Sequence, residues 1–316
     1  MTTMEELQHP PEAGTHTPLG ELPPELEPAP RSQLQLFWRR FRRHKMAMVG
    51  AVALVLLTLS AVFADAIAPQ GVNEIDLANT LQPPNADNWF GTDQLGRDVF
   101  SRVIYGGRIS LYIGFFVAIG AAMLGTFFGA IAGWFGGRTD KAVSRLIDLL
   151  LVIPAIAILA MALNAWGGDI RIVVLILAGL GWMQMARVVR GTVPQIREQQ
   201  YIEAARSSGA SNRRIIIRHV LPNAIGPIVV ATTLAVGIAI LTESTLSFLG
   251  YGIKTEDTAS PVSWGAMLSS ADGWIGTPQA YLLYFPGLFI LLTVLAVNFL
   301  GDGLRDALDP HSGHDK

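Results

Sequence analysis

The segment that decides the fold class is Leu111-Tyr-Ile-Gly-Phe-Phe-Val-Ala-Ile-Gly-Ala-Ala-Met-Leu-Gly-Thr-Phe-Phe-Gly-Ala-Ile-Ala-Gly-Trp134. It contains no charged side chain. An α-helix needs about 20 mostly apolar residues to cross the hydrocarbon core of a bilayer. The segment therefore predicts a transmembrane helix. Gly125, Gly129 and Gly133 recur every four residues, so they share one face of this helix, where small residues let a second helix approach closely.

Five further apolar segments of similar length flank this one. Charged residues make up 15% of the 316-residue chain, against about 25% in soluble domains. The six segments predict an all-α, polytopic membrane protein with about six transmembrane helices and exclude an ordinary soluble enzyme. Pro154 is expected to kink the third apolar segment. Their approximate limits are Ala47–Ala68, Leu111–Trp134, Leu146–Leu163, Ile172–Val193, Asn223–Thr242 and Tyr281–Leu300.

The placement of basic residues predicts the topology. With the N-terminus inside, 18 of the 23 Lys and Arg residues fall in cytoplasmic segments, so the positive-inside rule places both termini in the cytoplasm. The resulting division is a disordered Pro/Glu-rich cytoplasmic tail (1–30), a basic segment with the first transmembrane helix (31–69), an extracytoplasmic segment (70–110), a core (111–300) with a cytoplasmic loop (194–222), and a cytoplasmic tail (301–316).

Several kinds of chemistry are missing from the sequence. The chain has no cysteine, which excludes disulfides, thiolate metal sites and a cysteine nucleophile. It has no G-x-x-x-x-G-K-[ST] phosphate loop, so the chain itself is not expected to bind or hydrolyse ATP. No histidine cluster suggests a metal. We therefore expect no catalytic residue, no metal site and no cofactor in this chain.

The basic loop after the fourth segment predicts a helix–turn–helix. One helix is expected near Gln195–Ser208, and Gly209 suits the left-handed position that ends it. Ser211 or Asn212 can cap a second helix. That helix is expected to stop near Leu221, because the residue before a proline is disfavoured in the α region.

This loop also carries a recognisable pattern of residues. The pattern consists of Glu203, Ala204, Ala205, Gly209, Ile217 or a neighbouring isoleucine, Leu221 and Pro222. It resembles the EAA loop of ABC importer permeases. In that family the loop carries the coupling helix, which docks into a cleft of a cytoplasmic ATPase. The alternative is a surface helical hairpin without a partner.

Three other stretches are similar to the C-type permease subunit of the dipeptide/oligopeptide/nickel family. They lie at 91–111, 261–268 and 298–310. The resemblance implies a non-catalytic permease subunit in a bacterial inner membrane. Its implied partners are a homologous B-type permease, two cytoplasmic ATPases that bind ATP and Mg, an extracytoplasmic solute-binding protein and the lipid bilayer, with no nucleic acid. The implied substrate is a di- or oligopeptide.

Two alternatives to a peptide importer remain from the sequence. One is a nickel-uptake permease of the same family. The other is a secondary transporter or channel without ATPases, which would need ion-coupling carboxylates well inside its spans.

A few polar and aromatic residues are candidates for transport itself. Glu243 and Asn298 are candidates for the translocation path, with structural hydrogen bonding as the alternative. Trp264, Trp274 and Asp272 are candidates for docking of the binding protein. Anchoring of the tryptophans at the lipid headgroups is the alternative for that loop.

Overall fold

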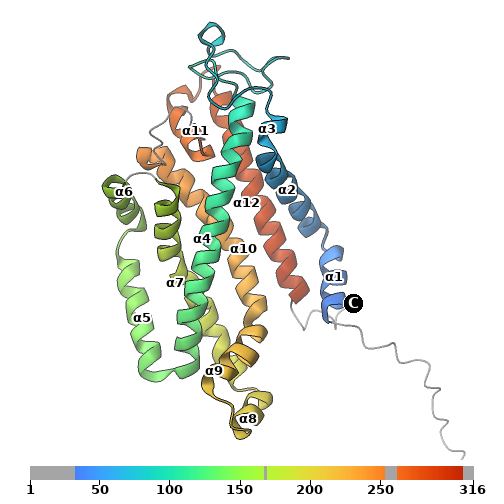
Figure 1. Cartoon of the computed structure of the whole chain (residues 1–316), viewed down its shortest axis with the longest axis vertical. Helices are drawn as coiled ribbons and strands as arrows, with labels where there is room; N and C mark the ends of the chain where they lie inside the picture. Colours follow the sequence, from blue (N-terminus) through green and yellow to red (C-terminus); the bar gives the residue numbers. More distant parts are fainter. Residues whose placement is uncertain (1–32, 167–168, 253–261, 309–316) are drawn as a thin grey trace, which may run out of the picture.

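The computed structural model describes residues 33–166, 169–252 and 262–308 (Figure 1). The tail 1–30, assigned above to disorder, and residues 309–316 lie outside these ranges. Within them the chain is helical, and its sole β feature is an isolated bridge between Thr92 and Asp98. The predicted all-α class is confirmed for this part of the chain.

Long helices form the body of the molecule, and short ones lie at its two ends. The long helices are α2 (Lys45–Val62), α4 (Val99–Phe135), α5 (Gly137–Val152), α6 (Ala155–Trp166), α7 (Ile170–Arg197), α10 (Leu221–Leu246) and α12 (Tyr281–Leu308). The shorter ones are α1 (Gln33–Arg43), α3 (Ala64–Ile67), η2 (Leu77–Asn79), α8 (Gln200–Ser207), α9 (Asn212–Ile215), η3 (Ile216–Val220), η4 (Ser247–Tyr251), α11 (Trp264–Ser270) and η5 (Asp272–Trp274).

The glycine stripe of α4 packs against α7. A side chain on Gly125 would collide with Met185, and one on Gly133 would approach Val193 Cβ to 2.8 Å. Gly129 faces the α7 backbone in the same way. The predicted packing face is therefore confirmed, and its partner is a helix of the same chain. Because residue numbers rise together along both helices, α4 and α7 run parallel.

This parallel packing fixes the number of crossings. Five helical segments within the described ranges are long and apolar enough to span a membrane, and α5 with α6 forms a sixth that is bent by 74°. The bend lies at Ile153–Pro154, where a proline is expected to break the helix. Since α4 and α7 run the same way, the chain must return across the bundle through α5 and α6 (Figure 1). The prediction of about six spans is thereby confirmed.

The two ends of the helix bundle carry different elements. The basic end carries α8, α9 and η3, and the positive-inside rule places it in the cytoplasm. The cap end carries residues 70–98 and α11 (Figure 1). At the cap end, Asp98 begins α4 by accepting hydrogen bonds from the Ser101 amide and hydroxyl, both at 2.7 Å.

The predicted stop of the second loop helix near Leu221 is wrong. Leu221 has α-helical backbone angles, and α9, η3 and α10 follow one another without a break. The reason is the π-helical turn η3, whose wider i→i+5 winding directly precedes α10. The last bond of this turn runs from the Leu221 amide to the Ile216 carbonyl, and Pro222, which has no N–H to donate, follows it directly in the first turn of α10.

The first loop helix is shorter than predicted. The expected range Gln195–Ser208 is divided, because α7 continues to Arg197 and α8 begins only at Gln200. The chain therefore turns after the end of α7, and α8 is a separate helix.

Candidate coupling site at the basic end

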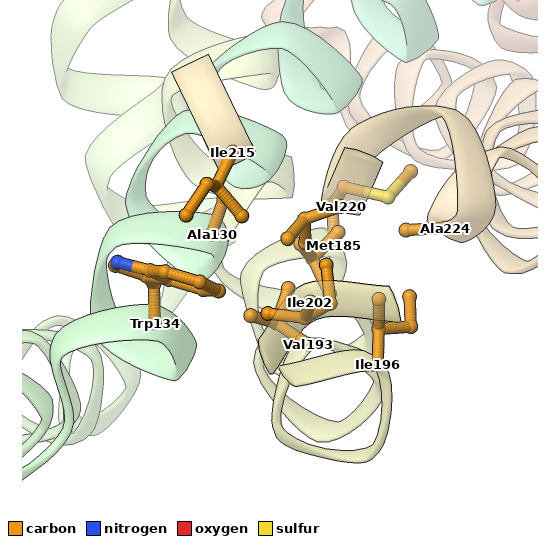
Figure 2. Packing of buried hydrophobic residues seen from close by; sticks show 10 residues of the cluster. Ala130, Trp134, Met185, Val193, Ile196, Ile202, Ile215, Val220 and Ala224 are labelled. Carbon is orange, nitrogen blue, oxygen red and sulfur yellow. The ribbon is translucent and has the colours of Figure 1, made fainter. Parts of the chain in front are cut away.

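An apolar cluster attaches the loop to the bundle. Ile202 of α8 and Ile215 of α9 are fully buried (0% exposed). Figure 2 shows their side chains pointing into one cluster with side chains from α4, α7 and the start of α10. The other members are Ala130, Trp134, Met185, Val189, Val193, Ile196, Val220 and Ala224. Ile202 lies between Tyr201 and Glu203, and Ile215 begins a run of three isoleucines. The loop pattern pointed to Ile217 or a neighbouring isoleucine and did not include Ile202.

Trp134, near the C-terminus of α4, adds a polar attachment. Its indole is 4% exposed, and the Arg206 guanidinium of α8 lies 4.9 Å from the ring centroid. Its carbonyl accepts a hydrogen bond of 2.9 Å from Arg197 at the end of α7. One residue of α4 thus holds both the loop helix and the span that precedes it.

Gly209 ends α8 in the way the sequence predicts. Its φ of +79° is left-handed. The Ala210 amide donates to the Ala205 carbonyl at 3.1 Å, and the Gly209 amide donates to the Arg206 carbonyl at 2.9 Å. These two bonds form a Schellman motif. No atom lies within 4 Å of the place where a side chain would start, so the demand for glycine comes from the backbone angle alone.

The outer face of α8 is exposed and carries two residues of the loop pattern, Glu203 and Ala204, with Ala205 half-buried beside them. Glu203 lies in the first turn of α8, where the helix dipole favours a carboxylate. No ion pair to Glu203 occurs among the described residues. A small, rigidly attached helix therefore presents an unpaired carboxylate beside alanines that allow close approach.

The remaining loop candidates lie on a separate surface. Ile217 is 55% exposed and lines an apolar groove of about 700 Å³ between α4 and the start of α10. Leu221 lines the same groove, whereas Pro222 is exposed outside it. The seven predicted loop residues thus form two surfaces, one on α8 and one on η3 and α10.

Glu243 lies in a buried hydrogen-bonded cluster. Its side chain is 2% exposed, and its Oε1 accepts bonds of 2.7 Å from the Ser247 and Ser263 hydroxyls. These bonds join α10 to the start of α11. Asn298 of α12 is half-buried and faces Gly237, about 9 Å along α10 from Glu243. The structure therefore does not bring the two path candidates together.

The three docking candidates have different surroundings. Trp264 is 1% exposed, and its indole N–H donates to the Val103 carbonyl at 2.7 Å, so it offers a partner no surface in this structure. Asp272 is exposed and Trp274 is half-buried in η5. The last two share one short helical turn at the cap end.

Comparison with protein-family models gives two matches. The family described as binding-protein-dependent transport system inner membrane component matches residues 125–313. The N-terminal TM domain of oligopeptide transport permease C matches residues 32–84. The first match includes the whole candidate coupling loop.

Similar proteins are found across most of the chain. The chain is 42% identical to a dipeptide transport system permease protein of Bacillus subtilis, over 88% of this chain and 86% of that protein. It is 41% identical to an oligopeptide transport system permease protein of the same organism, over 86% and 87%. It is also 42% identical to a glutathione transport system permease protein of Escherichia coli O157:H7, over 87% and 89%.

A solved structure shares the fold. The MetNI methionine ABC transporter, in an inward-facing conformation, contains a chain that aligns with a TM-score of 0.54 at 20% identity. The alignment covers 66% of this chain and 97% of that chain.

Proposed function

The chain belongs to the family of binding-protein-dependent transport system inner membrane components, and we propose that it is the permease subunit of an ATP-driven importer of di- or oligopeptides. The observation that carries the coupling role is the exposed outer face of α8 on its buried isoleucine attachment. Family membership favours this function over a secondary transporter or channel that works without ATPases.

The similar proteins support the peptide substrate. Their names specify dipeptides, oligopeptides and glutathione, and glutathione is itself a small peptide. A nickel-uptake permease is the competing assignment within the same family. The binding protein that delivers the substrate is expected to set this selectivity.

The proposed mechanism transmits motion through α8. A cytoplasmic ATPase grips the outer face of α8, with Glu203 available to pair with a basic group of the ATPase. Because Ile202, Ile215 and Arg206 fix the loop to α4 and α7, movement of α8 displaces these spans. ATP can drive the change only because the ATPases bind it differently in the two states of the complex.

The remaining parts of the proposal follow from family membership. The chain pairs with a B-type permease in a bacterial inner membrane and works with two ATPases, which bind ATP and Mg. The exposed turn with Asp272 and Trp274 is the proposed contact for the extracytoplasmic binding protein. Glu243 and Asn298 stay candidates for the translocation path, and the burial of Glu243 favours a structural role.

Charge reversal at Glu203 tests the coupling role. We expect Glu203→Arg to reduce co-purification of the ATPases and peptide-stimulated ATP hydrolysis at least about tenfold, since breaking an interfacial charge pair costs about 2–5 kcal/mol. The matched control is Asp302→Arg, which reverses an exposed carboxylate on α12 and should leave both readouts unchanged. Full ATPase association in Glu203→Arg, or uptake by the chain without ATPases, contradicts the proposal.

The substrate is tested separately. Ligand binding to the cognate binding protein is measured with di- and oligopeptides and with Ni²⁺. We expect peptide binding. Binding of Ni²⁺ alone contradicts the peptide assignment and leaves the coupling role standing.

A further inference from the structure

Helix α1 (Gln33–Arg43), directly before the first span, has no part in the proposed function. Residues 31–45 include six basic side chains and no acidic one. Four of them, Arg39, Arg40, Arg42 and Arg43, belong to α1, and Lys45 begins α2. The positive-inside rule accounts for the orientation of α2, but a helix with this much charge on one face also forms a surface.

The apolar face of α1 is fixed against two spans. Phe41 is 6% exposed and packs in one cluster with Ala47 of α2 and Ala307 of α12, and Phe37 and Leu304 pack around it. His44 separates α1 from α2 with an extended backbone, and its Nδ1 accepts a hydrogen bond from the Ala47 amide at 3.0 Å. Because α1 contacts the end of α12 and the beginning of α2, it lies at the depth of the membrane interface.

The opposite face of α1 is exposed and cationic. Arg39, Arg42 and Arg43 are exposed, and none of the three has an ion pair among the described residues. The nearby Asp306 carboxylate lies 3.4 Å from Nε2 of His44. Trp38 is 50% exposed, and the Arg42 guanidinium lies 5.3 Å from its ring centroid.

We infer that α1 is a binding site for anionic phospholipid headgroups of the leaflet at the basic end. Arginines at interfacial depth attract the phosphates of anionic lipids, and tryptophan favours the headgroup level because its ring is apolar and its N–H is polar. Because the apolar face of α1 packs against the spans, its basic face is turned outward and its charges are available to lipid headgroups. Lipid headgroups surround a span at this depth, so they complement the charge without any further protein.

The test uses the intact transporter in proteoliposomes. Photoactivatable phosphatidylglycerol and phosphatidylcholine are incorporated in parallel, and crosslinks to residues 33–45 are mapped by mass spectrometry. We expect phosphatidylglycerol to label α1 about tenfold more than phosphatidylcholine, because each basic residue near an anionic surface adds attraction. The excess should fall as salt is raised.

Two variants separate charge from folding. In Arg39→Gln/Arg42→Gln/Arg43→Gln, the labelling ratio of the two lipids should approach one. In Arg39→Lys/Arg42→Lys/Arg43→Lys, which keeps the charge, the ratio should stay high. The matched control is Arg213→Gln/Arg214→Gln/Arg218→Gln, which removes three exposed charges from the loop and should leave the ratio at α1 unchanged.

Three results would overturn the inference. The first is equal labelling of α1 by both lipids in the unsubstituted protein. The second is a ratio that the glutamine variant does not change. The third is the absence of labelling of α1 by either lipid in the intact transporter, which would assign the surface to a protein contact.

Discussion

The cap end and the basic end of the bundle are built on different principles. At the cap end, buried polar side chains form hydrogen bonds within the chain. Asp98 accepts a bond from the Ser101 amide at the start of α4, and the Trp264 indole donates to the Val103 carbonyl of α4. Glu243 accepts bonds from the hydroxyls of Ser247 and Ser263. At the basic end, the buried contacts of the loop are mainly apolar, and the exposed Glu203 has no ion pair among the described residues.

The difference indicates which substitutions should act on stability and which on assembly. Buried polar groups are costly unless they are bonded, so the hydrogen bonds within the cap end contribute to its stability. Three buried oxygens there, Asp98 Oδ1, Glu243 Oε2 and Ser244 Oγ, have no hydrogen-bond partner among the described residues. Exposed charges cost little to leave unpaired and stay available for other molecules. Substitutions at the cap end should therefore act on stability, and substitutions of exposed residues at the basic end should act on assembly.

The largest effect on stability is expected at Trp264. Trp264→Ala removes a fully buried ring and its bond to the Val103 carbonyl, at a cost of about 3–5 kcal/mol. The measurement is the thermal unfolding temperature of the detergent-purified protein. The matched control, Trp274→Ala, removes a half-buried ring and should cost less than about 1 kcal/mol. Equal effects of the two substitutions would contradict the description of the cap end.

An intermediate effect is expected at the loop attachment. Ile215→Ala leaves a cavity in the apolar cluster and should cost about 2–4 kcal/mol. Because Ile215 holds α9 against α4 and α7, we also expect faster hydrogen exchange in residues 200–215 and weaker ATPase association. Ile217→Ala, two residues later at a 55% exposed position, is the control and should leave exchange unchanged. If exchange is equally fast in both variants, the buried isoleucine is not the attachment.

The smallest effect is expected at Asp65, an exposed carboxylate at the cap end. Hydrogen bonds from Arg108 and Tyr105, at 2.8 and 2.7 Å, lower the pKa of Asp65 below its ordinary value of 3.8. A carboxylate with a lowered pKa stabilises the folded state above its unfolded pKa, and this stabilisation is lost as pH falls through the folded pKa.

The Asp65 prediction is checked by comparing the thermal stability of the unsubstituted protein with Asp65→Asn across pH. We expect a small advantage for the unsubstituted protein at pH 7 that shrinks below about pH 4. A difference that grows as the pH falls would contradict the sign of the effect. The exposure of Asp65 keeps the expected difference well below that of Ile215→Ala.

Local patterns predicted much of this molecule. Runs of apolar residues identified the spans, since only helix length and composition matter for crossing hydrocarbon. The left-handed Gly209 was also predicted, and the cap is Ser211, one of the two residues proposed for it; these signals depend on neighbouring residues alone. The stop before Pro222 was predicted wrongly, because the π-helical turn η3 takes the proline into the first turn of α10.

The roles of individual residues were likewise predicted where they depend on local sequence and missed where they depend on distant contacts. Glu203 and Ala204 were selected by their pattern in the loop, and the structure places them on an exposed face. Ile202 and Trp134 were missed, and Ile215 was included only as a neighbour of Ile217, because their importance comes from contacts with spans far away in the sequence. Trp264 was a docking candidate on the basis of its loop, but its side chain is buried under α4.

The sequence by itself determined the membrane class, the six spans, the placement of basic charge and the loop that resembles a coupling element. These features depend on composition and short spacing, which helices and bilayers select directly. The tertiary structure alone decided that α4 and α7 run parallel, that two isoleucines attach the loop, and that α1 turns a basic face outward. These features depend on which distant side chains meet, and that is set by packing across the whole bundle.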